Sequence, residues 1–102
     1  MKFKPCLEIK DINGNAFKKD ENTAAVIADF AITALTETFP GESCPAEKKI
    51  HRYNLAKRIK HAYDEKAEEI DLPSEDIALI KTCIGQHYPP KFVGPLFQAI
   101  EA

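Results

Sequence analysis

The sequence predicts an α+β fold, mainly helical, in which an N-terminal β-hairpin packs on a compact arrangement of about four helices. Residues 3–9 alternate apolar and polar side chains, as a strand with one buried face does, and the turn-forming pair Asn13-Gly14 follows. Later in the chain, apolar residues recur at helical spacing in segments separated by Pro, Gly and Ser. The chain of 102 residues contains no linker long enough to divide it, so residues 1–102 are predicted to form a single domain.

The hairpin is expected over residues 5–18, because an Asn-Gly pair tolerates the positive φ angles of a tight turn. Its apolar face would consist of Leu7, Ile9 and Phe17. A two-stranded ribbon is only marginally stable by itself, so this face must lie on the helices that follow.

A first helix is predicted from a capping residue at Asn22 or Thr23 to about Glu37. Apolar side chains cover most of its circumference between residues 24 and 35, so we expect it to be the central and most buried element of the fold. Its polar residues form one narrow stripe, which consists of Asp29, Thr33, Thr36 and Glu37.

The second helix is the longest and is predicted to run from about Pro45 to Ala67, because proline suits the first turn of a helix. One face combines apolar side chains, which would pack inward, with long polar side chains at its ends, whose aliphatic stems would cover the margin of the core. This face consists of Arg52, Leu55, Ala56, Ile59, Ala62, Tyr63 and Lys66.

A shorter helix is predicted from Glu75 to about Ile84, with Ser74 as its capping residue. Gly85 offers the left-handed conformation that commonly ends a helix. The inward side of this helix is predicted to carry Ile77, Ile80 and Ile84.

The last helix has two possible starts. If it begins at Pro90, Pro95 lies inside it and should kink it; if it begins at Pro95, Phe92 and Val93 belong to a docked loop. In either case apolar residues recur at helical spacing towards the end of the chain, at Phe92, Val93, Leu96, Phe97 and Ile100.

Composition and charge exclude several classes of protein. The chain has 14 basic and 16 acidic residues and a formal net charge of −2, which argues against a surface built entirely for nucleic acid. Cys6, Cys44 and Cys83 are odd in number and widely spaced, which is typical of reduced thiols in a cytosolic protein. No segment has the apolar core of a signal peptide or the long apolar run of a membrane helix, so we expect a soluble intracellular protein.

A calcium loop is suggested by the alternation of Asp11, Asn13 and Asn15, because such loops begin with oxygen ligands at positions 1, 3 and 5. However, position 6 is Ala16 where the sharp turn needs glycine, and position 12 is Asn22 where a bidentate glutamate is expected. We therefore predict a hairpin turn at this place and no calcium site.

Zinc binding and nucleophilic catalysis are also poorly supported. Cys83 and His87 are the only closely spaced pair of potential zinc ligands, and two ligands do not complete a tetrahedral site. Cys44 precedes a helix start, where the helix dipole lowers the pKa of a thiol, but no sequence signature places a histidine beside it. We assign no catalytic residue, no cofactor and no metal.

Charge is ordered unusually along the long helix. Residues 47–60 contain six basic side chains and one acidic side chain, whereas residues 64–71 contain five acidic and one basic, the reverse of what a helix dipole favours. In one interpretation this is a solvated surface with i, i+4 ion pairs, Lys60 with Asp64 and His61 with Glu65. In the other it is a basic patch for an acidic partner, because Lys57, Lys60 and His61 lie on the side opposite Ile59, with Lys49 close by.

Three segments, LEIKDINGNAF, EEIDLPSEDIALIK and YPPKFVGPLFQAIE, resemble in order and spacing a group of small, mostly uncharacterised proteins encoded by tailed bacteriophages and prophages. The shared features are a turn, a helix start and a Pro-Pro helix start. The resemblance implies a bacterial cytoplasm as the place of action and a small helical protein that works through binding. It carries no family active site.

We therefore expect a non-enzymatic phage or prophage protein that binds a host or phage protein through a helical face. Homo-oligomerisation is a variant of this hypothesis, because the apolar residues of the last helix offer more surface than a short helix buries. The alternative is a nucleic-acid-binding regulator that lays residues 48–60 against phosphates; a membrane partner is not expected. The candidate partner-binding residues are Lys49, Arg52, Lys57, Lys60, His61, Phe92 and Phe97.

Overall fold

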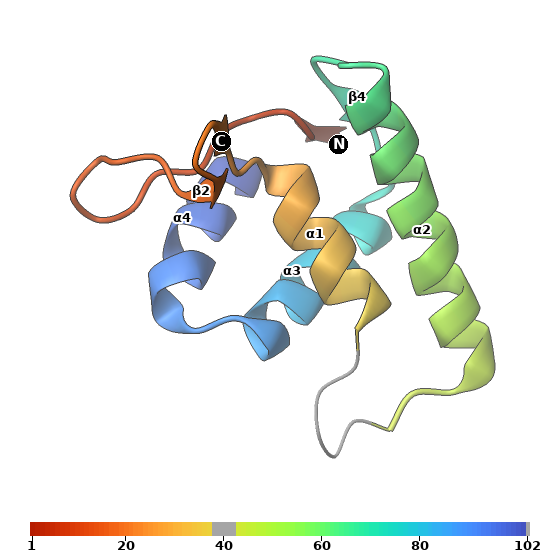
Figure 1. The fold of residues 1–102 in the computed structure, drawn as a ribbon. Helices are drawn as coiled ribbons and strands as arrows, with labels where there is room; N and C mark the ends of the chain where they lie inside the picture. The colour runs from red at the N-terminus through yellow and green to blue at the C-terminus, as the bar shows by residue number, and fades with distance from the viewer. Residues whose placement is uncertain (38–42, 102) are drawn as a thin grey trace.

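The computed structural model describes residues 1–37 and 43–101, which form helices and two short antiparallel strand pairs with a radius of gyration of 13.2 Å (Figure 1). The mainly helical α+β prediction is confirmed. Every described helix is too short or too polar to cross a membrane. In chain order the elements are β1 (Lys2–Phe3), β2 (Lys18–Asp20), β3 (Thr23–Ala24), α1 (Ile27–Thr36), α2 (Ala46–Asp64), β4 (Ile70–Asp71), α3 (Ser74–His87) and α4 (Pro90–Glu101).

Helix α1 is the centre of the fold, as the apolar run 24–35 predicts. It packs against α2 and α3, and Phe30 extends its contacts to α4 through the ring of Phe92 (Figure 1). Alanines on the buried side allow the neighbouring helices to approach its backbone closely. The buried residues of α1 are Ile27, Ala28, Phe30, Ala31, Ala34 and Leu35.

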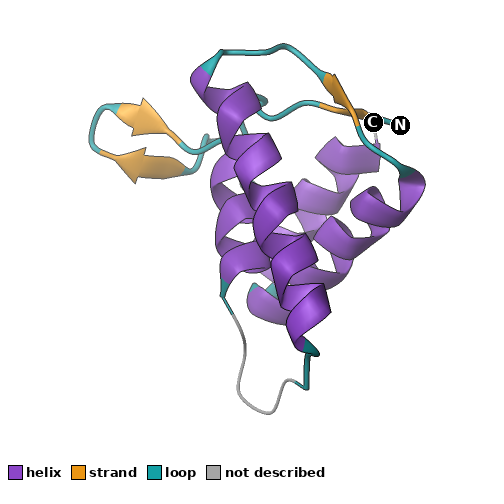
Figure 2. Cartoon of the chain, turned by 90° about the vertical axis from the view of Figure 1, so that its right-hand side faces the viewer, coloured by secondary structure: helices purple, strands orange, loops and turns teal. Residues whose placement is uncertain are grey.

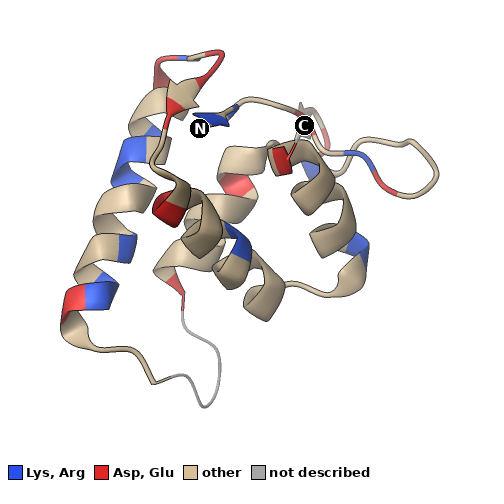
Figure 3. Cartoon of the chain, turned by 180° about the vertical axis from the view of Figure 1, so that it is seen from behind, with Lys and Arg blue, Asp and Glu red and all other residues tan. Residues whose placement is uncertain are grey.

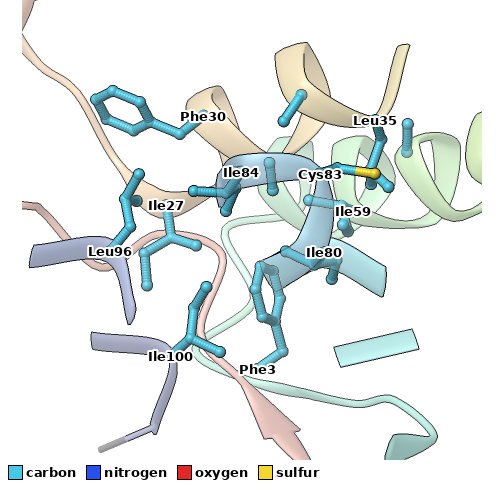
Figure 4. Close-up of a cluster of buried hydrophobic side chains, with 14 of the residues drawn as sticks. Phe3, Ile27, Phe30, Leu35, Ile59, Ile80, Cys83, Ile84, Leu96 and Ile100 are labelled. Atoms are coloured by element: carbon cyan, nitrogen blue, oxygen red, sulfur yellow. The ribbon is translucent and has the colours of Figure 1, made fainter. Parts of the chain in front are cut away.

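The core joins all four helices to the N-terminal strand (Figure 4). Phe3 of β1 is 1% exposed and lies among isoleucines of the helices. Burial of each such side chain contributes roughly 1.5–3 kcal/mol, so the core accounts for most of the favourable free energy of folding. Side chains of this core that are no more than 1% exposed include Phe3, Ile27, Ile59, Ile80, Ile84 and Leu96.

The N-terminal turn forms where Asn13-Gly14 predicts it. Gly14 has a φ of 84°, and the Asp11 carboxylate accepts hydrogen bonds from the backbone N–H groups of Asn13 and Asn15, both at 2.9 Å. These bonds use Asp11 as a turn-forming side chain.

The predicted hairpin of residues 5–18 forms next to this turn, where Lys10 pairs with Ala16, but a third segment joins it. The Ile9 carbonyl accepts from the Phe17 N–H, while the Ile9 N–H donates to the Ala25 carbonyl and the Ala25 N–H donates to the Phe17 carbonyl. Three chain segments thus share backbone hydrogen bonds at one point. A second hairpin, with a shift in register between Lys18 and Asp20, forms between β2 and β3. Figure 2 shows this hairpin extending from one side of the helices.

The same pairing delays the start of the first helix. A cap at Asn22 or Thr23 was predicted, but Thr23–Ala24 is strand β3 and α1 begins at Ile27. The Asp29 carboxylate accepts a hydrogen bond from the Val26 N–H at 2.9 Å and so closes the first turn.

Strand β1 pairs with β4, which connects α2 to α3. The sequence does not predict this pairing. Lys2 lies opposite Asp71 and Phe3 opposite Ile70. The predicted alternation in residues 3–9 holds in part, because Phe3, Pro5 and Ile9 are buried while Leu7 is exposed.

The ends of the later helices also differ from prediction. Helix α2 stops at Asp64, and Lys66 then turns the chain with a φ of 57°. Ser74 is the first residue of α3 rather than its cap, and Gly85 lies inside α3, where a Cβ would be 3.8 Å from the Phe97 ring. Gly85 thus lies inside the helix instead of ending it, and a Cβ there would make only an ordinary contact with α4.

The two possible starts of the last helix are resolved. Helix α4 begins at Pro90 and continues through Pro95, so Phe92 and Val93 belong to the helix. Leu96 and Ile100 are buried in the core.

Candidate functional site

The seven candidate residues are divided among three environments. Arg52 points into the protein and is only 5% exposed. Its guanidinium donates hydrogen bonds to the carbonyl oxygens of Leu35 at 3.0 Å, Ala34 at 3.1 Å and Glu37 at 2.8 Å. These carbonyls end α1, where a helix leaves acceptors without intrahelical donors and where a cation is favoured. Arg52 therefore fastens α1 to α2 and is not available on the surface.

Phe92 and Phe97 lie on α4 and are half-buried. The Phe92 ring centroid is 4.7 Å from that of Phe17 and 5.5 Å from that of Phe30. The Phe97 ring lies against α3, with the Nζ of Lys81 at 5.2 Å from its centroid. Much of the apolar surface of α4, from which self-association was inferred, is thus covered within the chain. We define the aromatic cluster as Phe17, Phe30, Tyr88 and Phe92.

The remaining four candidates lie together on the outward side of α2, which Figure 3 shows with basic residues along its length and acidic residues in the segment beyond it. Two large apolar side chains accompany them: Ile50 is 61% exposed and Tyr53 is 58% exposed. Spacing of three, four and seven residues places these side chains on one side of the helix. We call this surface the α2 face, and it consists of Lys49, Ile50, Tyr53, Lys57, Lys60 and His61.

A groove of about 370 Å³ runs between α1 and α2 beside this face. Ala56 is buried at its base, and Ile32 contributes a half-buried apolar side chain from α1. The groove therefore has an apolar floor and a basic rim. We call it the α1–α2 groove, and it is lined by Ile32, Thr36, Tyr53, Ala56, Lys57, Lys60, His61 and Asp64.

Some cations of the α2 face have partners within the helix. Lys60 Nζ is 2.7 Å from Asp64 Oδ1, and His61 Nε2 is 3.1 Å from Glu65 Oε1. These contacts are the i, i+4 pairs that the sequence predicts. Exposed pairs of this kind contribute only about 0–1 kcal/mol, so a carboxylate of a partner can compete with Asp64 for Lys60.

Lys49 and Lys57 have no carboxylate partner among residues 1–37 and 43–101. The Nζ of Lys57 lies 5.8 Å from the Tyr53 ring centroid, within the range of a cation–π contact. These two lysines are available to a carboxylate from outside the chain.

A further lysine, Lys19, contacts Tyr63 of α2 outside the lining of the groove. Lys19 Nζ donates to the Tyr63 hydroxyl at 3.0 Å and to Asp29 Oδ1 at 3.1 Å, and Lys60 Nζ lies over the same ring at 5.3 Å. The hydrogen bond to Tyr63, with a smaller contribution from Asp29, raises the pKa of Lys19 above its ordinary value. Lys19 therefore stays charged at every pH at which the protein would act.

A second cavity, of about 820 Å³, lies elsewhere, between α2 and α3. It contains a histidine–carboxylate pair, in which His51 Nε2 is 2.9 Å from Asp76 Oδ1, and the Cys44 Sγ lies 3.8 Å from an Arg52 nitrogen. No hydrogen bond joins Cys44 to His51 in the part of the chain that is described, so this α2–α3 cavity lacks the thiol–base contact of nucleophilic catalysis. The described residues also contain no group of three or more metal-ligating side chains.

Comparisons of the chain with models of protein families, with curated proteins and with solved structures found no match. The functional argument therefore depends on the α2 face and the α1–α2 groove. Ile50 and Tyr53 were not among the sequence candidates, although both fall outside the inward stripe of α2 and could have been recognised by that signal. Ile32 could not be recognised from the sequence, because its place in the groove depends on how α1 packs beside α2.

Proposed function

We propose that this chain is a non-enzymatic protein that binds a protein partner through the α2 face and the α1–α2 groove. The observation that carries the proposal is the exposure of Ile50 and Tyr53 among lysines that have no acidic partner in the described chain. Apolar anchors surrounded by a polar rim are typical of protein interfaces, and tyrosine is common among residues that dominate binding energy.

The resemblance to proteins of tailed bacteriophages and prophages supports a partner of host or phage origin, met in the bacterial cytoplasm. The proposal does not depend on self-association. Self-association was inferred from Phe92 and Phe97, but much of the surface of both rings is covered by contacts within the chain.

Nucleic acid is a weaker candidate for the same surface. Of the four cations that a helix over residues 48–60 was expected to lay against phosphates, Arg52 is buried, and Arg58 donates to the Asp71 carbonyl at 2.8 Å. Lys57 and Lys60 remain, and Lys49 of the α2 face adds a third cation. Strong affinity for nucleic acid depends on many neutralised phosphates, and these three cations supply few.

Binding measurements on two variants test the proposal. Tyr53→Ala combined with Lys57→Glu removes one apolar anchor and reverses one unpaired charge of the α2 face. Lys48→Glu is the matched control, because it reverses a charge on the same helix but on the side that lines the α2–α3 cavity. Partners captured from a bacterial lysate are purified, and their affinities for each protein are measured by calorimetric titration.

We expect the captured partner to bind the native protein and Lys48→Glu alike and to lose roughly tenfold or more in affinity for the double variant. Equal affinity for all three proteins would overturn the proposal. In a parallel anisotropy titration with duplex and single-stranded DNA at ~50 mM and ~200 mM salt, salt-sensitive binding that Lys57→Glu and Lys60→Glu abolish would support the nucleic-acid alternative instead.

A further inference from the structure

We propose that the occupant of the α1–α2 groove is an acidic, amphipathic helical segment of the partner. This inference rests on the proposed function and specifies the chemistry of the partner. It follows from the shape of the groove, from the distribution of charge around it and from the two apolar residues beside it.

The shape of the groove suits a helix. It lies between two helices that pack side by side, as Figures 1 and 2 both show, and an additional helix fits such a groove by inserting its ridge of side chains. From Lys49 to His61 the α2 face extends over just more than three turns, or roughly 18 Å, which matches a partner helix of about 13 residues. The described strands are only two or three residues long, so they offer little edge for an extended peptide to pair with.

The charge around the groove selects acidic residues. Lys49 and Lys57 have no carboxylate partner in the described chain, and Lys60 has an exposed one that a ligand can displace. Asp64 and the acidic residues that follow it lie at the other end of the face, so the partner's acids should be confined to the stretch opposite Lys49, Lys57 and Lys60.

The apolar residues favour a protein over a nucleic acid. Ile50 is 61% exposed, and Ile32 and Ala56 form a floor without hydrogen-bonding groups. Aliphatic surface of this kind contributes to affinity when apolar side chains cover it and contributes little against phosphates. The partner segment should therefore carry apolar residues at i, i+3 or i+4 and i+7, with acids flanking them.

A display selection tests this composition without knowledge of the natural partner. A library of random 16-residue peptides is selected on the native protein, and peptides that also bind the variant Tyr53→Ala with Lys57→Glu are removed. We expect the retained peptides to be enriched in Asp and Glu and to carry apolar residues at helical spacing. Their affinity should fall as salt rises from ~50 mM to ~200 mM, because exposed charge pairs are screened.

A charge-reversed protein supplies the decisive comparison. Selection on Lys57→Glu with Lys60→Glu should enrich basic peptides, and acidic peptides from the first selection should bind it roughly tenfold more weakly. Lys48→Glu should leave their affinity unchanged, and circular dichroism confirms that each variant is folded. Retained peptides that are basic or uncharged, or the absence of any peptide that depends on the α2 face, would overturn the inference. A captured natural partner that needs Tyr53 but contains no acidic helix would overturn it too, while the proposed function would stand.

Discussion

Arg52 of α2 donates a hydrogen bond from its Nε to the carbonyl oxygen of Leu35 at the end of α1, at 3.0 Å. The same guanidinium reaches the carbonyls of Ala34 and Glu37. The last carbonyls of the central helix are thus bound by a side chain from its neighbour.

Replacement of Arg52 by Met should destabilise the protein by about 2–5 kcal/mol, because buried carbonyls lose their donors. Arg52→Lys should recover only part of this free energy, since an ammonium cannot reproduce the fork of guanidinium donors. Urea unfolding followed by circular dichroism measures both values. A change below about 0.5 kcal/mol for Arg52→Met would show that water replaces these hydrogen bonds.

Ile59 and Ile50 offer a matched pair on one helix, with exposures of 0% and 61%. Ile59→Ala should cost roughly 2–5 kcal/mol through lost burial and the cavity that remains, as should Phe30→Ala in α1. Ile50→Ala should change stability by less than about 0.5 kcal/mol. Equal effects at positions 50 and 59 in denaturant unfolding would contradict the packing of α2.

Two glycines should respond to alanine in opposite directions. Gly14 has a φ of 84°, so Gly14→Ala should destabilise by roughly 1–2 kcal/mol through backbone strain alone. Gly85 lies in α3, where a Cβ would make an ordinary contact with Phe97 at 3.8 Å, so Gly85→Ala should stabilise by about 0.5–1 kcal/mol. Melting temperatures decide the signs, and a destabilised Gly85→Ala would mean that α4 packs more tightly on α3 than described.

Tyr88 should ionise at a higher pH than an ordinary tyrosine. Burial raises the pKa of its hydroxyl above the ordinary value of 10.0, because the phenolate would lose hydration. The folded state therefore holds this proton more tightly than the unfolded state, so its contribution to stability is complete below pH 10 and is lost as pH rises further. The absorbance of tyrosinate, measured against pH, should show an ionisation step above pH 10 that is missing in Tyr88→Phe. An unchanged curve for that variant would refute the assignment.

The elements that the sequence predicts well are those whose signal lies within one segment. The apolar positions around Phe30 and Ile59 identify the inward sides of α1 and α2, because helical periodicity depends only on local spacing. Gly14 likewise marks its turn through a local backbone requirement.

The features that the sequence does not reveal depend on segments that are far apart in the chain. Strand β1 meets β4 across most of the sequence, and two-residue strands carry no recognisable alternation. Arg52 is predicted to cover the margin of the core, but its hydrogen bonds become apparent only when the end of α1 is placed beside it. For the same reason, only the α2 side of the α1–α2 groove could be predicted from the sequence. Its lysines lie on one helix, but Ile32 comes from another.

The aromatic cluster has a consequence for the order in which the protein becomes protected from solvent exchange. Phe17, in the N-terminal ribbon, packs with its ring centroid 4.7 Å from that of Phe92, near the other end of the chain. The ribbon is marginal by itself, so its backbone amides should become slow to exchange with deuterium only once α4 has docked. The amides of Ile9 and Phe17 should then open together with α4 as one cooperative unit, although nearly the whole chain separates them in sequence.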